Sequence, residues 1–201
     1  MELKERIIEC ASLLFFRKGI KSTTMSDVAN ASGISKRTLY EAFHDKEELL
    51  DICFEENIKK SEMEIDEIVK SSEDVIETMM RIYTKYLSEM QNANKSTVYD
   101  LKKYHPSIYK KIECKQAEDT NSFIPLFQRG VEQGFIRKDL NIEITIWLLK
   151  SQFRALIENN FPSDKYSAGE IIRIIMLNFI RGIATLKGLE KIEKLMSELK
   201  N

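Results

Sequence analysis

Apolar residues recur at three- and four-residue steps from the start of the chain, with charged residues between them. The first such run extends from Leu3 to Phe15 and is followed by Gly19. This period is that of one face of an α-helix, and a glycine after the last apolar position commonly ends a helix. The pattern therefore predicts an amphipathic helix that ends near Gly19.

Signals for three further helices follow within the next thirty residues. Residues 24–27 have the Thr-x-x-Asp form of an N-terminal cap, and Gly33 ends the short helix that this cap opens. Ser35 can cap a second short helix, and residues 45–48 form another capping box at the start of a longer one. Helices this short are unstable alone and must share a core. We predict that this core contains Ile8, Ala11, Leu14, Phe15, Val28, Ala29, Ile34, Leu39 and Phe43.

The remaining three quarters of the chain also have a helical period. We expect one helix from 106 to about 134, opened by Pro106 and kinked at Pro125. The other expected helices lie at about 46–69, 74–91, 97–103, 142–157, 168–186 and 188–199. Only seven glycines and three prolines occur in 201 residues, which favours long helices over sheet. We predict an all-α fold.

Composition limits the class of protein. Hydrophobic residues make up 43% and charged residues 31% of the chain, as in a globular protein with a sizeable core. No apolar run approaches the roughly 20 residues that span a bilayer, and the acidic residues of MELKERIIEC do not fit a signal peptide. We expect a cytoplasmic protein without a membrane partner.

The sequence has no residue pattern that is typical of a catalytic or metal-binding site. The thiols Cys10, Cys53 and Cys114 lack disulfide or zinc spacing, so we expect buried or half-buried apolar roles, with a redox sensor as the alternative. His44 and His105 are far apart, and no Ser/His/Asp set or carboxylate pair has meaningful spacing. We expect no enzyme activity, no metal and no cofactor.

The segment from 24 to 44 has the spacing of a helix-turn-helix. Ala29 is small enough for two helices to approach, Gly33 tolerates the positive φ of the turn, and Leu39 supplies an apolar plug. With Leu39 facing inward, the outer surface of the second helix carries Lys36, Arg37, Tyr40 and His44. The N-terminal part of such a helix enters the major groove of DNA.

The local charge supports this interpretation although the formal net charge is only -1. From Arg17 to Lys46 there are six basic and three acidic residues. The alternative is a helical interaction or scaffold protein whose helix-turn-helix is structural, with these charges on a solvated face.

The stretch TTMSDVANASGISKRTLYEAFHDKEELL resembles the DNA-binding segment of TetR-family transcriptional regulators. The matching positions are Thr24, Val28, Ala29, Ser32, Gly33, Ile34, Ser35, Thr38, Leu39, Tyr40, Phe43, Lys46, Glu47 and Leu49. The match covers about the first 55 residues. It implies a three-helix DNA-binding domain at 1–46 and a larger helical domain for ligand binding and dimerisation at 47–201.

The resemblance also implies roles for single residues. The expected phosphate contacts are Thr24, Ser26, Tyr40 and Lys46, and a helix N-terminus favours the last of these on physical grounds too. The expected base contacts are Ser35, Lys36, Arg37 and Thr38, with His44 at the rim. Many members of the family have a small residue at the position of Arg37. Arg37 therefore reads a guanine edge or adds a phosphate contact, and both remain open.

For the larger domain, the resemblance implies a homodimer and an unknown small-molecule effector, with repression as the commoner outcome. The expected interface contains Trp147, Phe153, Leu156, Ile172, Ile175 and Phe179. The expected pocket contains Met63, Met79, Tyr83, Tyr86, Met90, Tyr99, Phe123, Phe127 and Trp147, which would suit a largely apolar ligand. The alternative for these residues is ordinary core packing.

Overall fold

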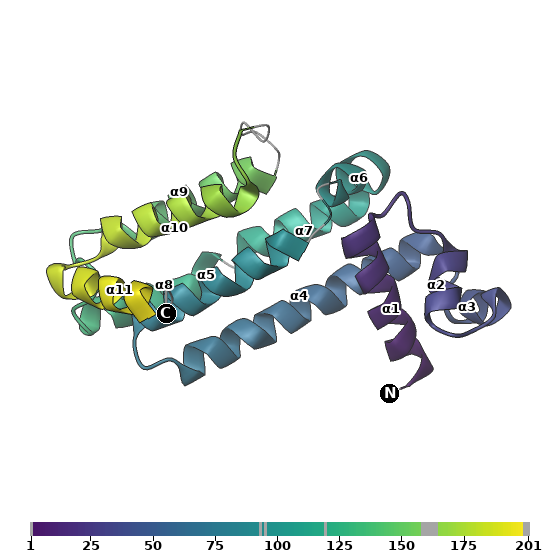
Figure 1. Cartoon of the computed structure of the whole chain (residues 1–201), viewed down its shortest axis with the longest axis horizontal. Helices are drawn as coiled ribbons and strands as arrows, with labels where there is room; N and C mark the ends of the chain where they lie inside the picture. Colours follow the sequence, from purple (N-terminus) through teal and green to yellow (C-terminus); the bar gives the residue numbers. More distant parts are fainter. Residues whose placement is uncertain (1, 93, 95, 119, 158–164, 199–201) are drawn as a thin grey trace. The chain divides into compact units, whose positions relative to one another are not determined.

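A computed structural model describes residues 2–92, 94, 96–118, 120–157 and 165–198, and the regular structure in these ranges is α-helical apart from one isolated β-bridge (Figure 1). The all-α prediction is confirmed. The helices are α1 (Leu3–Lys18), α2 (Met25–Ala31), α3 (Lys36–Ala42), α4 (Lys46–Ser71), α5 (Val75–Asn92), α6 (Thr97–Tyr104), α7 (Pro106–Glu118), α8 (Thr120–Glu132), α9 (Ile142–Ile157), α10 (Ala168–Ile183) and α11 (Leu186–Glu198). In the described ranges, every helix is too short or too polar to span a bilayer.

The chain forms two compact units, each built from two separate segments. The first contains Met1–Glu64 and Asn92–Glu113, and the second contains Ile65–Gln91 and Cys114–Asn201. Helices α1–α3, most of α4, α6 and part of α7 therefore belong to one unit. A functional boundary between residues 46 and 47 stays a prediction, and this position falls within the first compact unit.

The core of the first unit matches the predicted one in six of its nine positions. Ala11, Phe15, Val28, Ala29, Leu39 and Phe43 are buried, whereas Ile8, Leu14 and Ile34 are only partly buried beside them. Ile7 takes the fully buried position on α1, and Leu101 and Ile108 join the core from α6 and α7. The helical period of α1 allows either neighbour to face inward, and contacts with distant segments select Ile7.

Local capping signals predict the helix starts well. Ser35 accepts a hydrogen bond from the Thr38 N–H, and Ser167 forms a capping box with Glu170. The helix expected from 106 to 134 corresponds to α7 and α8, which lie on either side of residue 119, outside the described residues, and Pro125 lies inside α8.

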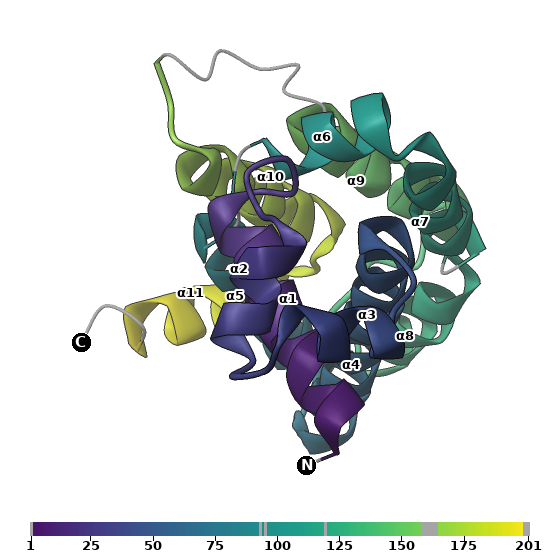
Figure 2. The same ribbon diagram turned by 90° about the vertical axis from the view of Figure 1, so that its right-hand side faces the viewer.

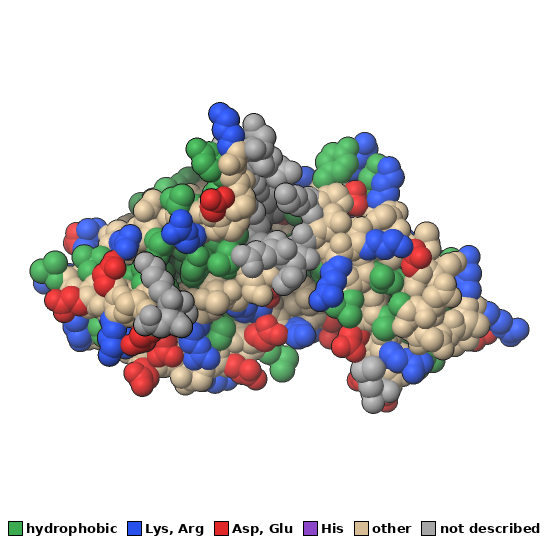
Figure 3. All heavy atoms as spheres, viewed as in Figure 1, with side chains coloured by type: hydrophobic (Ala, Val, Ile, Leu, Met, Phe, Trp, Pro, Cys, Tyr) green, Lys and Arg blue, Asp and Glu red, His purple; other side chains and the backbone are tan. Residues whose placement is uncertain are grey.

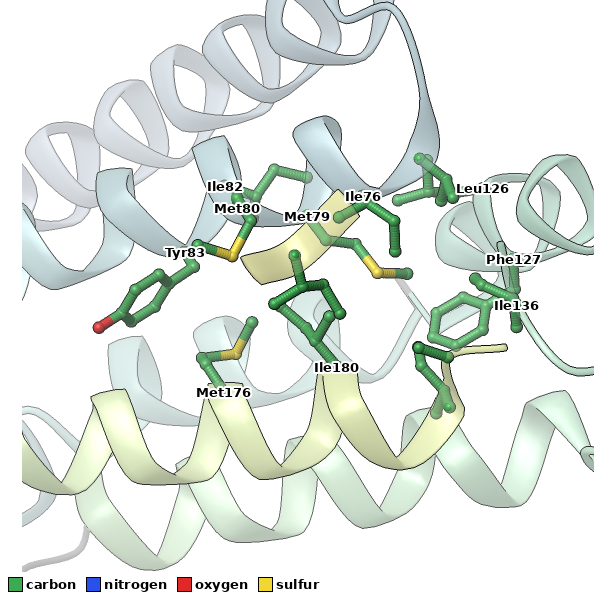
Figure 4. Close-up of a cluster of buried hydrophobic side chains, with 14 of the residues drawn as sticks. Ile76, Met79, Met80, Ile82, Tyr83, Leu126, Phe127, Ile136, Met176 and Ile180 are labelled. Carbon is green, nitrogen blue, oxygen red and sulfur yellow. The ribbon is translucent and has the colours of Figure 1, made fainter. Parts of the chain in front are cut away.

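The second unit packs α5 and α8–α11 around its own apolar core. Side chains from α5, such as Ile76 and Met79, point toward Met176 and Ile180 of α10 (Figure 4). Within this core an isolated antiparallel bridge joins Ile136 to Ala184. The second unit is therefore a self-contained helical bundle.

The cysteines differ in exposure. Cys53 is buried, and burial raises the pKa of its thiol to about 11. Cys10 is half-buried, as expected, but Cys114 is exposed. The high pKa keeps Cys53 a thiol at neutral pH, which suits a packing role.

Replacing Gly188 by alanine should destabilise the second unit. Gly188 lies in the first turn of α11, and an added Cβ would overlap the Phe135 carbonyl oxygen, which is fixed backbone. We expect a loss of about 1–3 kcal/mol in the free energy of unfolding, measured with urea. Gly182→Ala in α10 is the control, since a Cβ there meets nothing within 4 Å. An equal stability of the two variants at the same protein concentration would contradict this account.

Candidate nucleic-acid interface

Helices α2 and α3 form the turn that the sequence predicts. Gly33 has a φ of 65°, in the left-handed region, and the Ile34 N–H donates to the Ala29 carbonyl over 3.0 Å. Ala29 and Leu39 are both buried in the core of the first unit. In Figure 2 the two helices lie beside each other at the near side of the picture. The opposite surface of α3 therefore faces solvent.

Three adjoining side chains dominate this outer surface of α3. Lys36, Arg37 and Tyr40 are exposed, and the Lys36 ammonium lies 5.9 Å from the centroid of the Tyr40 ring. Arg37 pairs with Glu41 through its Nε over 2.9 Å, and its side chain is 88% exposed. Lys and Arg side chains project in the same region of Figure 3. This surface offers two cations and a phenol to an anionic partner.

Ser35 and Thr38 mainly form hydrogen bonds with each other. The Ser35 hydroxyl accepts from the Thr38 N–H over 3.1 Å, and the two hydroxyls lie 2.9 Å apart. Ser35 is exposed and Thr38 half-buried. Both stand at the N-terminus of α3, where unpaired backbone N–H groups and the helix dipole favour an anion.

At the start of α2, Thr24 and Ser26 are both exposed but differ in their hydrogen bonds. The Thr24 hydroxyl accepts from the Asp27 N–H and donates to the Asp27 carboxylate over 2.8 Å, which completes a capping box. Hydrogen bonds from the Thr24 N–H and then its hydroxyl lower the pKa of Asp27, and Lys18 adds to this. The hydroxyl hydrogen of Thr24 is thus already used within the protein.

His44 and Lys46 lie on either side of the cap of α4. His44 is exposed, and its backbone N–H donates to the Glu48 carboxylate. Lys46 is half-buried, and its ammonium donates to the carbonyl of Ile20 in the turn between α1 and α2. Burial lowers the pKa of Lys46, and the charge of Asp100 opposes this shift. The structure thus gathers the predicted contact residues around α2 and α3, with the Lys46 ammonium turned inward.

The predicted pocket residues do not all lie together. Those within or against the core of the second unit are Met79, Tyr83, Tyr86, Phe123 and Phe127. Figure 4 shows Tyr83 at one end of the labelled group, with its hydroxyl directed away from the others. Met63 and Tyr99 belong to the first unit and are 67% and 57% exposed, and Trp147 is 64% exposed. The side chain of Met90 lies outside the described residues.

The predicted interface residues also divide. Ile172 is fully buried within the core of its own unit, so it offers no surface to a partner. Phe153, Ile175 and Phe179 are half-buried, and the side chain of Leu156 lies outside the described residues. Sequence reasoning missed three large exposed apolar residues on α9 and α10, which are Ile144, Leu148 and Ile174. The same apolar segments contain them, but which residue faces outward depends on the packing of each helix.

Comparison with known proteins agrees with this site. Residues 7–52 match the family model described as bacterial regulatory proteins, tetR family. An uncharacterized HTH-type transcriptional regulator, YvaF of Bacillus subtilis, is 25% identical over 183 residues, covering 90% of this chain and 95% of the relative. The HTH-type transcriptional repressor KstR2 of Mycobacterium tuberculosis is 22% identical over 142 residues, covering 69% and 71%.

A solved structure extends the likeness over the whole fold. The transcriptional regulator FadR of Bacillus subtilis, in complex with stearoyl-CoA, superposes with a TM-score of 0.65 at 18% identity and covers 89% of this chain and 97% of that one. The helix-turn-helix and the helical bundle are those of a DNA-binding transcriptional regulator. Through residues 7–52 the chain carries the N-terminal segment of the tetR family of bacterial regulatory proteins.

The two hydroxyls at the start of α2 should respond differently to removal. Thr24→Ala removes the N-cap and should lower the free energy of unfolding by about 1 kcal/mol. Ser26→Ala, the matched control, should change it by less than about 0.5 kcal/mol, because this exposed side chain does not cap the helix. Urea unfolding of both variants measures the difference. A Thr24→Ala variant as stable as the wild type would show that the capping box contributes little.

Proposed function

We propose that this regulator is a repressor that binds a palindromic operator as a homodimer and leaves it when a small, largely apolar effector binds. The observation that carries the proposal is the outer surface of α3, which presents Lys36, Arg37 and Tyr40 while Leu39 anchors the helix in the core. A rigid helix with donors at its N-terminal end fits the major groove.

The proposed DNA contacts divide into two kinds. Ser26 and Tyr40 would hydrogen-bond phosphates, and Thr24 would do so only by giving up its bond to Asp27. Lys36 and Arg37 would reach base edges, with Ser35 and Thr38 beside them and His44 at the rim. The phosphate contacts fix the position of the helix, and the base contacts provide specificity.

Exposed apolar side chains support the homodimer. Trp147 and Ile174 are 64% and 54% exposed, and Ile144 and Leu148 lie on the same two helices, α9 and α10. Helices α9 and α10 contact each other, and large exposed apolar side chains gathered on neighbouring helices are typical of interaction sites on globular proteins. Two copies joined by such a face would present two identical half-site readers, and this symmetry accounts for a palindromic operator.

The apolar interior of the second unit supports a largely apolar effector. Met79, Tyr83 and Phe127 lie buried in this core, and Tyr86 and Phe123 pack against it. Methionine and aromatic side chains adapt to apolar guests. The likeness to FadR concerns the fold at 18% identity, so the class of effector rests on these residues.

The proposed release works by a shift of population. In one conformation of the dimer the two α3 helices have the spacing that the operator requires, and in the other they do not. An effector that binds the second conformation more tightly lowers operator affinity, by an amount set by its difference in affinity for the two. Because both half-sites must bind together, a modest change of spacing is sufficient.

Replacing Arg37 by alanine should separate its two possible contacts. A base contact predicts a loss of about 1–3 kcal/mol confined to one operator position, where the variant no longer distinguishes bases. A phosphate contact predicts weaker binding to every sequence and a salt slope smaller by about 0.9. Selection from a random DNA library and titration at several salt concentrations measure both effects.

The same selection tests the proposed function. Wild-type protein that enriches no sequence, and shows no salt-dependent DNA binding, would favour the scaffold alternative. Ala replacement of Tyr40 is a second probe of the same surface, since it removes a proposed phosphate hydrogen bond without changing charge.

Replacing Ile174 by lysine should disrupt the homodimer. A charge at the centre of a closed apolar interface remains unpaired, and this strongly opposes association. Sedimentation at micromolar concentration should show a monomer. Leu13→Lys is the control, because Leu13 is similarly exposed, at 50%, but lies on α1. A variant as dimeric as the wild type would place the interface elsewhere.

A further inference from the structure

A buried carboxylate of α6 binds the turn that leads into α2. Asp100 is only 4% exposed, and its Oδ2 accepts from the backbone N–H of Lys21 over 3.0 Å and lies 3.5 Å from the Ser96 hydroxyl. Figures 1 and 2 both show α6 beside this turn. All three residues belong to the first compact unit. A contact between residues 79 positions apart thus fixes one N–H of the turn.

A second side chain holds the preceding residue of the same turn. The Lys46 ammonium, at the start of α4, donates to the carbonyl of Ile20 and lies 5.8 Å from the centroid of the Phe15 ring. The negative charge of Asp100 favours the charged form of Lys46. Two adjacent residues of the turn are therefore held from two different helices.

The held turn determines where α2 begins. Only two residues separate Lys21 from Thr24, which caps α2 and is followed by the exposed Ser26. A displacement of the turn would displace this N-terminus, which carries the phosphate contacts proposed above.

We propose that Asp100 and Lys46 are positioning residues for DNA binding, which hold the turn so that the N-terminus of α2 meets the DNA backbone. In this proposal the Lys46 ammonium stays inside the protein and makes no phosphate contact. The inference rests on the proposed DNA binding and assigns roles within it.

The packing of Lys46 opposes an alternative in which its ammonium turns outward to a phosphate. That movement would leave the Ile20 carbonyl with the longer hydrogen bond from the Thr23 N–H, over 3.4 Å, and would take the nearby positive charge away from Asp100. The loss of a partner by a buried polar group or charge is costly. Lys36, which lies exposed on α3, can approach DNA without such a loss.

The salt dependence of operator binding tests the role of Lys46. Lys46→Met keeps the aliphatic chain beside Phe15 but removes the charge. We expect weaker binding with a wild-type slope of log Kd against log salt, because no phosphate contact is lost. Lys36→Met is the matched comparison, since it removes an exposed cation proposed to reach a base edge: it should relax base preference at one operator position, which Lys46→Met should leave unchanged. A fall of about 0.9 for Lys46→Met would overturn the proposal.

The direction of the change in operator affinity tests the positioning role of Asp100. Removal of a negative charge should, by electrostatics alone, strengthen DNA binding. A positioning role predicts the opposite, with Asp100→Ala about tenfold weaker because a charged hydrogen bond to the turn is lost. Asp100→Asn should lose less, because its amide oxygen can still accept from Lys21. Glu9→Gln, on the exposed surface of α1, is the control for charge and should bind as tightly as the wild type or more tightly.

Hydrogen exchange adds a readout at the turn itself. The amide of Lys21 should exchange faster in folded Asp100→Ala than in the wild type, and Asp100→Asn should lie between them. Wild-type affinity or tighter binding for Asp100→Ala would overturn the positioning role. Failure of the wild type to bind any DNA would instead overturn the proposed function, and the positioning role with it, so the two failures are distinguishable.

Discussion

Leu39 lies fully buried in the core that α1–α4 share with parts of α6 and α7, and the outward surface of α3 depends on this contact. Helices α2 and α3 have seven residues each, too few to be stable in isolation. Burial of Leu39 and Phe43 therefore fixes both the existence of α3 and its rotation. Because that rotation is fixed, Lys36, Arg37 and Tyr40 face solvent together.

The same core explains why the compact unit that contains the DNA-binding helices does not end at the start of α4. Leu101 and Ile108 enter it from a segment that lies some fifty residues further along the chain. Asp100 and Lys46 then add polar contacts to the turn before α2. The site is thus built on a unit of two chain segments, and the segment containing α6 takes part in holding the helix-turn-helix.

Local signals in the sequence were sufficient for most helix boundaries and for the helix-turn-helix. Caps at Thr24 and Ser35 and the turn at Gly33 involve residues within five positions of each other, so the hydrogen bonds follow from local sequence.

The sequence by itself determined the all-α fold, the residue types on α3 and the resemblance of residues 7–52 to the tetR family, because these depend on periodicity and on short motifs. Only the tertiary structure decided that Lys46 turns toward Ile20, that Asp100 binds the turn, and that Ile174 faces outward while Ile172 is buried. The direction of these side chains depends on contacts between segments far apart in the chain. Helical periodicity narrows a face to a few neighbouring residues, and packing against other helices selects among them.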